Sequence, residues 1–439
     1  MKTPIYDFLS QYNKNDISRL HMPGHKGFDF LGCEHLDITE IQGADDLYNP
    51  SSIIFESEKN AAKVFDTGAT FYSCEGSSLS IRTMIYTALL SRKKKNKKII
   101  AVRNSHKSFI SACAILDIDI VWIYPENSNG ICAGTVTSYE VEECLKNNTD
   151  AFALFLTSPN YIGEMTDISC ISDVCKKYEV SLLVDNAHGA YLKFCNMHPI
   201  HLGADICCDS AHKTLPVLTG GAYLHVSKDN VSRYSPYIKK GLALFGSTSP
   251  SYLILASLDL CNKYLNNNYS AELKKCINKV KYLKEEITKK GIKIIDGEPL
   301  KITMCCDGTK AKDILNKSNV ECEYYDKNVL VLMFSPQNKE ADYTRIINSL
   351  NDIKFSRCDN PPPVIMPGIK KMSVRDAYFS EFETVNSKDA LNRICAISAI
   401  SCPPAIPIAV SGELITQNII DNLDYYGIDK VDVVKKYAD

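Results

Sequence analysis

The sequence predicts an α/β fold with a large, mostly parallel sheet domain and a smaller α/β domain toward the C-terminus. The main observation is a series of short apolar segments of strand length that alternate with amphipathic helical segments. Short apolar strands separated by helices are typical of a parallel sheet covered on both faces. The second observation is the length, because 439 residues are too many for one simple core and suit two or three packed units.

The large domain is expected to contain six of these apolar strands. They are residues 98–102, 118–124, 151–156, 180–184, 205–208 and 222–226. Apolar residues recur at helical spacing in 79–90 and 167–178, which predicts helices there. A long helical region over about 250–290 ends the domain, and its second half is rich in lysine.

A second strand and helix pattern begins near Gly291 and predicts the small α/β domain. Its expected strands are 292–295, 301–305, 321–325 and 329–334, and its expected helices are 310–316 and 340–350. A proline-rich linker over 361–368 leads to a last, mixed segment. The predicted organisation is therefore an N-terminal arm (1–50), a large domain (51–290), a small domain (291–358) and a C-terminal segment (359–439). We expect the arm to be extended, because it carries turn residues and little periodicity.

Composition and charge exclude several classes of function. Hydrophobic residues make up 45% and charged residues 23% of the chain, and the formal net charge is −2, so no nucleic-acid partner is expected. We interpret the basic run 92–98 as a solvated helix end and loop.

No signal peptide or membrane span is expected. The 18 cysteines include no CxxC pair, which argues against a zinc ribbon and favours thiols in a reducing cytoplasm.

Two chemically distinctive residues follow neighbouring expected strands. Asp185 ends the strand 180–184, and Lys213 comes shortly after the strand 205–208. Taken alone, Asp185 is compatible with an aspartate that caps a turn, and Lys213 with an exposed loop lysine. Taken together they suit a catalytic pair, because ligands bind at the carboxyl ends of strands in open α/β sheets. A lysine desolvated there would have a lowered pKa, which favours the neutral, nucleophilic amine.

This pair meets the demands of the cofactor pyridoxal 5'-phosphate (PLP). PLP needs a lysine for its Schiff base, a carboxylate beside its ring nitrogen, and a phosphate site of backbone N–H groups and hydroxyls. The run Gly76-Ser77-Ser78 before the helix 79–90 is a candidate phosphate cradle or simply an N-cap. His106 is a candidate for stacking on the ring, or else a hydrogen-bonded structural histidine. The run 247–249 offers a second hydroxyl-rich helix start.

Five motifs strengthen this interpretation because they occur together and in order. They are residues 21–27 (HMPGHKG), 103–108 (RNSHKS), 185–189 (DNAHG), 210–215 (SAHKTL) and 248–252 (TSPSY). This set resembles the bacterial ornithine/lysine/arginine decarboxylase family, in the short form that lacks an N-terminal wing domain. The resemblance covers most of the chain and includes the tail at 403–407 and 411–413. It implies the aspartate-aminotransferase-like fold of PLP fold type I.

The resemblance also implies a role for each matching residue. Lys213 would form the Schiff base, and Asp185 would pair with the pyridinium nitrogen. His106 would stack on one face of the ring and Ala187 on the other, with His188 near the reacting carbon. The phosphate would be bound or surrounded by Ser77, Ser78, Ser210 and His212, with Thr248 reaching it from the neighbouring subunit. A homodimer, or a higher oligomer of dimers, with shared active sites is therefore expected.

Two departures from the family pattern bear on the site and the tail. Glu75 is acidic where a small neutral residue is usual beside the phosphate loop. Ala405 stands where glycine is usual. Neither removes a residue that PLP needs, but such departures leave the choice of substrate open. The region of Asp45 and Asp46 is a candidate for binding the distal cation of a substrate.

The predicted reaction is PLP-dependent α-decarboxylation of arginine, lysine or ornithine to CO₂ and agmatine or a diamine, as in polyamine biosynthesis. Lys213, His188 and Asp185 would be the catalytic residues, with Lys213 or His188 returning a proton to Cα. The same lysine and aspartate also serve transamination and elimination or transfer at Cβ or Cγ, which differ in the bond that is aligned. A third alternative is a PLP-binding homologue without catalytic activity.

Overall fold

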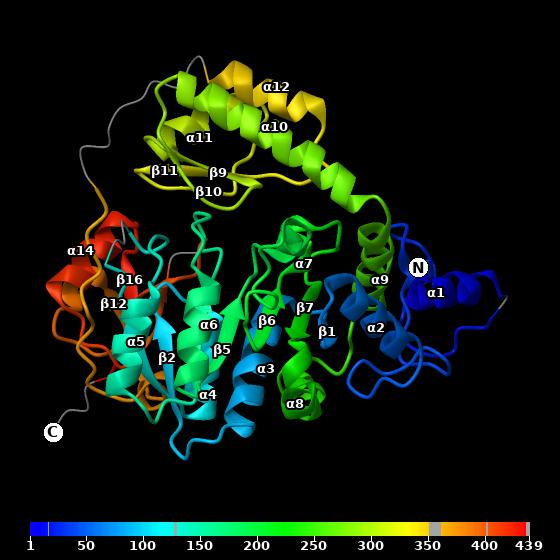
Figure 1. Cartoon of the computed structure of the whole chain (residues 1–439), viewed down its shortest axis with the longest axis horizontal. Coiled ribbons are helices and arrows are strands. Elements are labelled where there is room, and N and C mark those ends of the chain that lie inside the picture. Colours follow the sequence, from blue (N-terminus) through cyan, green and yellow to red (C-terminus); the bar gives the residue numbers. More distant parts are fainter. Residues whose placement is uncertain (16, 127–129, 351–360, 401–402, 436–439) are drawn as a thin grey trace. The chain divides into compact units, whose positions relative to one another are not determined.

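The computed structural model describes residues 1–15, 17–126, 130–350, 361–400 and 403–435. The chain forms two compact units, each built from two separate stretches of sequence. Unit 1 contains Met1–Lys93 and Ser181–Glu272, and unit 2 contains Lys94–Val180 and Leu273–Asp439. Figure 1 labels their helices and strands, and both units contain helices and strands, as the α/β prediction requires. The predicted boundary at 358 lies outside the described residues.

Unit 1 contains four neighbouring strands in the order β1-β7-β6-β5. β5 and β6 are parallel, whereas β7 is antiparallel to both of its neighbours. The strands are β1 (Ala69–Ser73), β5 (Ser181–Asp185), β6 (Ile206–Asp209) and β7 (Ala222–Val226). Every residue of β5, β6 and β7 is buried, as expected for strands in the core of a sheet.

Helices cover this sheet, and two of them, α3 and α7, carry candidate site residues. They are α1 (Pro4–Lys14), α2 (Ile53–Phe65), α3 (Gly76–Leu90), α7 (Ala211–Thr214), α8 (Val231–Phe245) and α9 (Tyr252–Asn267), with 3₁₀ turns at Glu34–Leu36, Ala190–Cys195 and Lys228–Asn230. α3 and α8 pack closely because Gly241 has no side chain. A Cβ at Gly241 would lie 2.9 Å from Tyr86 and 3.0 Å from the Thr83 side chain.

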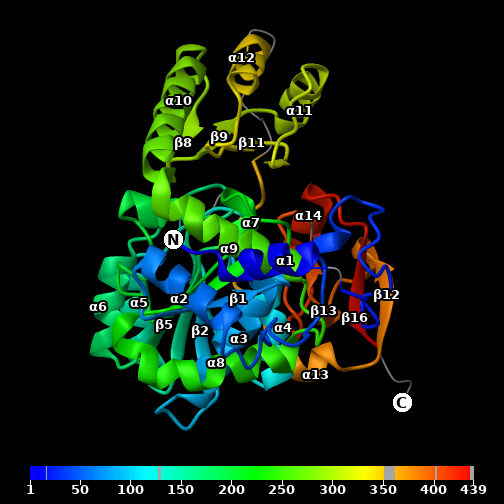
Figure 2. The same cartoon turned by 90° about the vertical axis from the view of Figure 1, so that its right-hand side faces the viewer.

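The N-terminal arm is not extended throughout, so that part of the prediction is wrong. Pro4 begins α1, where its missing N–H costs nothing, and Ile5, Leu9 and Tyr12 are buried at helical spacing. α1 packs beside α9, where the carboxylate of Asp259 accepts the Ile5 N–H at 2.9 Å (Figure 2). The packing of this short amphipathic stripe, rather than any long periodic pattern, stabilises the helix.

Unit 2 begins with three parallel strands in the order β4-β2-β3. They are β2 (Lys98–Val102), β3 (Asp119–Ile123) and β4 (Ala153–Thr157), and the connecting helices are α4 (Lys107–Leu116), α5 (Ser138–Asn147) and α6 (Ile168–Lys177). α6 begins where Asp167 accepts the Cys170 N–H at 3.1 Å, which satisfies one of the donors left over at a helix start. The predicted strand 98–102 is confirmed as β2.

The predicted region 250–290 consists of two helices, α9 and α10 (Tyr269–Lys289), and α10 leads into a four-stranded antiparallel sheet. This sheet has the order β10-β11-β9-β8. Its elements are β8 (Ile294–Ile295), β9 (Lys301–Cys305), α11 (Gly308–Lys317), β10 (Tyr324–Tyr325), β11 (Val329–Met333) and α12 (Glu340–Ser349). The small α/β pattern expected from the sequence is therefore present, with shorter first and third strands.

The C-terminal segment forms a three-stranded sheet in the order β12-β16-β13 and a two-stranded pair, β14 and β15. Its elements are α13 (Val374–Tyr378), β12 (Phe382–Asn386), a 3₁₀ turn at Ser387–Asp389, β13 (Cys395–Ile397), β14 (Ala399–Ile400), β15 (Pro407–Ala409), α14 (Gln417–Tyr425) and β16 (Lys430–Val434). None of the helices in the described part of the chain has the length and apolar composition that a bilayer-spanning helix needs.

Arg103, which opens one of the family-like motifs, fastens the C-terminal segment within unit 2. Its buried guanidinium donates to the Pro407 carbonyl at 2.7 Å and to the Ile408 carbonyl at 2.9 Å. The Lys107 N–H, at the start of α4, donates to the Ala405 carbonyl at 3.0 Å. Ala405 has a φ of +58°, in the left-handed region that favours glycine, which explains why glycine is usual there.

Replacing Ala405 by glycine should therefore stabilise the protein. The strain of the Ala405 Cβ at positive φ destabilises the folded state by about 1–2 kcal/mol, and glycine removes it. Glycine also loses more chain entropy on folding, so the net increase in the free energy of unfolding is about 0.5–1 kcal/mol. Thermal unfolding should show a higher midpoint for Ala405→Gly. As a control, Ala409→Gly in strand β15 should lower the midpoint. A lower midpoint for both variants would contradict the prediction.

Candidate active site

The parallel pairing of β5 and β6 sets the geometry of the candidate site in unit 1. Val184 pairs with Cys207 and Asp185 with Cys208, so both strands end at the same edge of the sheet. Asp185 is the last residue of β5, and β6 ends one residue before Ser210. The loops that follow the two strands therefore begin side by side, as the sequence predicts for a ligand-binding edge.

Lys213 and His188 meet across these two loops. Lys213 lies in the single-turn helix α7, and its Nζ is 2.9 Å from Nε2 of His188. The ring of His188 is almost fully buried, with 3% exposure. An ammonium at Lys213 has only donors, so Nε2 of His188 accepts this hydrogen bond and the ring proton is on Nδ1. The two residues can thus exchange a proton directly.

Lys213 itself is exposed, so the desolvation expected from the sequence is not found. The reason is local: α7 is one turn long, and only Ala211 and Thr214 of its four residues are buried. The amine at Lys213 is therefore accessible to a carbonyl compound. Its reactivity depends on its contact with His188 rather than on burial.

Asp185 provides a buried carboxylate at the same edge. It is 3% exposed, and its Oδ1 accepts the Ala187 N–H at 3.1 Å. Burial raises the pKa of Asp185, while the positive charge of Lys213 acts in the opposite direction. A cationic ring nitrogen placed at this carboxylate would favour its ionised form further. Ala187 is also buried and lies between Asp185 and His188 in the chain.

The start of α3 is the candidate phosphate site, and it is joined to this edge by a bond from Ser210. Helix N-termini direct backbone N–H groups and a partial positive charge toward an anion. Gly76 begins α3 with a φ of +67°, and a Cβ there would have one neighbour within 4 Å, the His212 ring at 3.9 Å. The Ser210 hydroxyl donates to the Ser77 hydroxyl at 2.8 Å, and Ser78 follows on the first turn.

His212 completes this hydroxyl-lined cradle. Its Nδ1 lies 3.0 Å from the Gly221 carbonyl, and its backbone N–H donates to the same oxygen at 3.2 Å. Burial lowers the pKa of His212, and the neighbouring charge of Lys213 acts in the same direction. The lowered pKa favours a neutral ring. Its Nδ1 donates to the Gly221 carbonyl, and its Nε2 is not part of that contact.

The contacts of Glu75 explain why this chain has an acidic residue at a position where the family pattern has a small neutral one. It lies directly before α3, and its carboxylate accepts the Ser247 N–H at 2.6 Å. The Tyr48 hydroxyl donates to the Ser247 carbonyl at 2.6 Å. These two bonds fix the loop that carries Thr248 between α8 and α9. The side chain of Thr248 is exposed, and its role toward a neighbouring subunit stays a prediction.

His106 belongs to unit 2, whereas the other candidate site residues belong to unit 1. It is the N-cap of α4, and its Nδ1 accepts the Ser108 N–H at 3.1 Å. This contact fixes the orientation of the ring and is compatible with the structural role considered above. Stacking of His106 on a cofactor stays a prediction.

Asp45, one of the two candidates for binding a substrate cation, has a structural role at the start of α2. Its carboxylate accepts backbone N–H groups at the start of α2, from Ser51 and Ser52 at 2.8 Å and from Ile54 at 3.0 Å. Partial burial alone would raise the pKa of Asp45, but these hydrogen bonds outweigh it and lower the pKa. Asp46 is exposed and is the remaining candidate of the two.

The sequence reasoning missed a buried polar cluster directly behind the two loops. It consists of His198, Asp209 and His225, with the side chains of Asn186 and Cys207 in contact. Two signals pointed to it: an aspartate at the end of an apolar strand, immediately before Ser210, and a histidine within the apolar strand 222–226. Neither has a place in the PLP pattern, so neither was assigned a role.

Comparison with known proteins shows the family to which the chain belongs. The family model "Orn/Lys/Arg decarboxylase, major domain" matches residues 3–305. The arginine decarboxylase of Bacillus subtilis is 31% identical over 96% of this chain and 94% of that protein. The arginine decarboxylase of Halalkalibacterium halodurans is 31% identical over 97% of this chain and 92% of that protein.

Solved structures agree on the fold. The lysine decarboxylase of Francisella novicida superposes with a TM-score of 0.80 at 18% identity, covering 99% of this chain and 81% of that one. Lysine decarboxylase A of Pseudomonas aeruginosa gives a TM-score of 0.82 at 16% identity, covering 98% and 80%. The fold is thus that of PLP fold type I, and the protein is an amino-acid decarboxylase. The chain belongs to the Orn/Lys/Arg decarboxylase family.

Replacing Lys213 by alanine should abolish covalent attachment of PLP. Lys213 carries the accessible amine at this edge, next to His188 and Asp185. Purified protein would be mixed with PLP, reduced with borohydride and analysed by peptide mass spectrometry. Wild type should carry the label on the peptide that contains Lys213, and Lys213→Ala should carry none.

Lys228→Ala is the matched control, because Lys228 is an exposed lysine of the same unit that pairs with Asp66 at 2.6 Å. It should retain the label at the wild-type level. A reducible covalent link that persists in Lys213→Ala would refute the assignment.

Proposed function

We propose that this protein uses PLP to remove the α-carboxylate of a basic L-amino acid, with arginine as the first candidate ahead of lysine and ornithine. The contact between Lys213 Nζ and His188 Nε2 at 2.9 Å, beside the buried Asp185, carries the proposal. The products would be CO₂ and agmatine or a diamine. These amines are polyamine precursors, and we place the reaction in the cytoplasm.

The residues of unit 1 fit PLP in chemical type. Lys213 would hold the cofactor covalently, Asp185 would keep a proton on its ring nitrogen, and Ala187 would pack on the ring. The phosphate would lie at the start of α3, near Ser77, Ser78, Ser210 and His212, with Thr248 from a neighbouring subunit. When bound, PLP supplies a sink for the electron pair that remains after CO₂ leaves.

Proton transfer is the task of Lys213 and His188. After the bond between Cα and the carboxylate breaks, Cα needs one proton. The exposed amine of Lys213, when protonated, can deliver it, and the hydrogen bond that Nε2 of His188 accepts holds this amine in place. Each turnover consumes one proton, and solvent can return it to the amine because Lys213 is exposed.

The relatives support arginine over the other basic substrates. Four relatives named arginine decarboxylase are 29–31% identical to this chain over 94–97% of its length, and the biodegradative arginine decarboxylase of Escherichia coli is 22% identical over 62%. The constitutive lysine decarboxylase of Escherichia coli is 23% identical over 60% of the chain. Relatives at this distance share the family chemistry, and the side-chain pocket decides the substrate.

A substrate panel tests the reaction. Arginine, lysine and ornithine would each be incubated with the PLP-loaded enzyme, and CO₂, amines and keto acids would be quantified, with Lys213→Ala as the inactive control. We expect CO₂ and agmatine in equal amounts from arginine. Keto acid without CO₂ would favour transamination, and cleavage at Cβ or Cγ would favour the lyase alternative. No product despite bound PLP would favour a homologue without catalytic activity.

We also propose that the enzyme acts as a homodimer or an oligomer of dimers. Support comes from the N-terminal arm, where Leu20, Phe30 and Leu31 are 93%, 76% and 88% exposed. A cluster of large apolar side chains at such exposure is typical of a surface that another protein covers. The exposed Thr248 in the same unit is consistent with a site completed by a second copy.

Sedimentation velocity tests the dimer. Wild type should sediment as a dimer or larger, and the double variant Phe30→Asp, Leu31→Asp should dissociate and lose activity, because two carboxylates would be buried unpaired in the interface. Tyr139→Asp, at an exposed site on α5, is the control and should keep the wild-type state. A fully active wild-type monomer would refute the proposal.

A further inference from the structure

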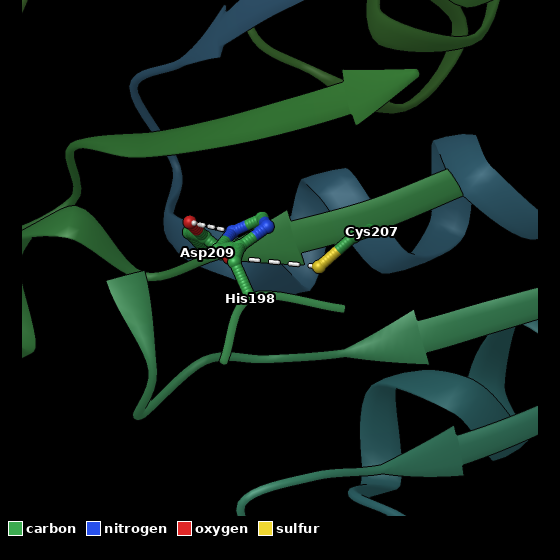
Figure 3. A group of neighbouring side chains, drawn as sticks. All are labelled: His198, Cys207 and Asp209. Carbon is green, nitrogen blue, oxygen red and sulfur yellow. Dashed lines mark hydrogen bonds and ion pairs between the residues drawn. The ribbon is translucent and has the colours of Figure 1, made fainter. Parts of the chain in front are cut away.

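A buried polar cluster lies at the end of β6, directly behind the candidate active site. Asp209, His198 and His225 are each fully buried, with 0% side-chain exposure. Figure 3 shows dashed lines that join the Asp209 carboxylate to a ring nitrogen of His198 and to the sulfur of Cys207. An ionisable group in such a place must be stabilised by its neighbours, because burying an uncompensated charge is costly.

The carboxylate of Asp209 is surrounded by donors. Its Oδ2 lies 3.0 Å from Nε2 of His198 and 3.2 Å from Nε2 of His225. Its Oδ1 accepts the side-chain amide of Asn186 at 2.7 Å and is 3.6 Å from the sulfur of Cys207. Burial alone would raise the pKa of Asp209, but the two histidines outweigh it and hold the pKa well below its ordinary value.

The tautomers of the two rings follow from their other contacts. The Ile200 N–H lies 3.4 Å from Nδ1 of His198, so this nitrogen accepts and the ring proton is on Nε2, which points at Asp209. Nδ1 of His225 is 2.8 Å from the Thr70 hydroxyl, which can donate to it. Each ring can therefore direct an N–H donor at the carboxylate of Asp209.

This arrangement distinguishes a hydrogen-bond network from a metal site. The ligand atoms of His198, Cys207 and Asp209 lie within 4.8 Å of one another, and these residue types can bind zinc. A metal on Nε2 of His198 would need the lone pair that the proton occupies. Because the Ile200 N–H donates to Nδ1 of His198, the ring proton stays on Nε2. The geometry therefore favours a hydrogen-bond network over a metal site.

The network reaches the active site through Asn186. Asn186 lies between Asp185 and Ala187, and within the described part of the chain its Oδ1 has no hydrogen-bond partner. The bond from its Nδ2 to Asp209 is therefore what anchors the side chain. The turn is tightly packed around it, because a Cβ at Gly189 would come within 1.9 Å of Asn186 Oδ1.

Asp209 also determines where the second loop begins. It is the last residue of β6, and Ser210, which bonds to Ser77, follows it directly. One carboxylate thus connects the loop that carries His188 with the loop that carries Lys213. These are the two side chains whose atoms must stay within hydrogen-bond distance.

We propose that Asp209 is a positioning residue for the decarboxylation: through Asn186 and the two histidines it fixes the loops so that His188 and Lys213 stay in contact. This inference rests on the proposed function, because it assigns Asp209 a role in aligning the groups of that same site. Asp209 does not touch the substrate. Its effect is on the rate of the chemical step and on the reaction of Lys213 with a carbonyl.

The first test is Asp209→Asn, which keeps the size of the side chain but removes its charge. We expect kcat to fall about 10- to 100-fold with KM changed less than about two-fold, as is usual when a group behind the reacting residues is altered. Asp259→Asn is the matched control. Asp259 is a fully buried aspartate of the same unit that binds Ser57 and the start of α1, and its variant should keep the wild-type kcat.

A second variant keeps the test decisive if Asp209→Asn does not fold. Asn186→Ala breaks the link to the loop of His188 but leaves Asp209 with both histidines. It should show the same fall in kcat at unchanged KM. Where both variants fold, the double variant should lose no more than the stronger single one, because the two residues act through one bond. Independent, multiplicative losses would overturn the proposal.

A readout apart from activity separates this inference from the proposed function. The rate at which PLP and borohydride label Lys213 should fall several-fold in Asp209→Asn and stay unchanged in Asp259→Asn. If wild type decarboxylates nothing yet this difference persists, the function is wrong and the positioning role stands. Equal labelling rates and equal kcat in folded Asp209→Asn would refute the role, and so would one tightly bound zinc per wild-type chain by elemental analysis.

Discussion

The parallel pairing of β5 with β6 is the constraint on which the site depends. Because Asp185 is in register with Cys208, the two strands end together and their loops start at neighbouring points. The buried carboxylate, the Lys213 and His188 pair and the candidate phosphate site at α3 all follow from that edge. A shift of register by one residue would turn Asp185 to the opposite face of the sheet and would separate the two loops.

The sequence was sufficient for the fold class and for the edge of the sheet where the site lies. Apolar strands such as 98–102 and 301–305 were confirmed at the predicted bounds, because buried strands have a strong compositional signal. α1 was missed because its stripe of Ile5, Leu9 and Tyr12 is short and lies among turn residues. Its stability comes from packing on α9, a contact between distant segments that no local pattern reveals.

The site was predictable in its residue types but not in its environment. Lys213 and Asp185 could be selected because chemistry demands a lysine and a carboxylate at strand ends. The exposure of Lys213 could not be predicted from the sequence, because it depends on α7 being a single turn. The network of Asp209, His198 and His225 brings together a loop and two strands, so its members are far apart in sequence and share no motif.

The order of segments in unit 1 has a consequence for biosynthesis. Its first stretch ends at Lys93, but the partner of β1 is β7, where Ala69 pairs with Val226. β1 therefore leaves the ribosome long before the strand that pairs with it, and during that interval the backbone N–H and C=O groups that will pair with β7 have no native partner. Such delayed, non-local pairing slows folding and leaves an unpaired strand edge that is prone to aggregation. The nascent chain of this enzyme should thus depend on chaperones most strongly between synthesis of β1 and of β7.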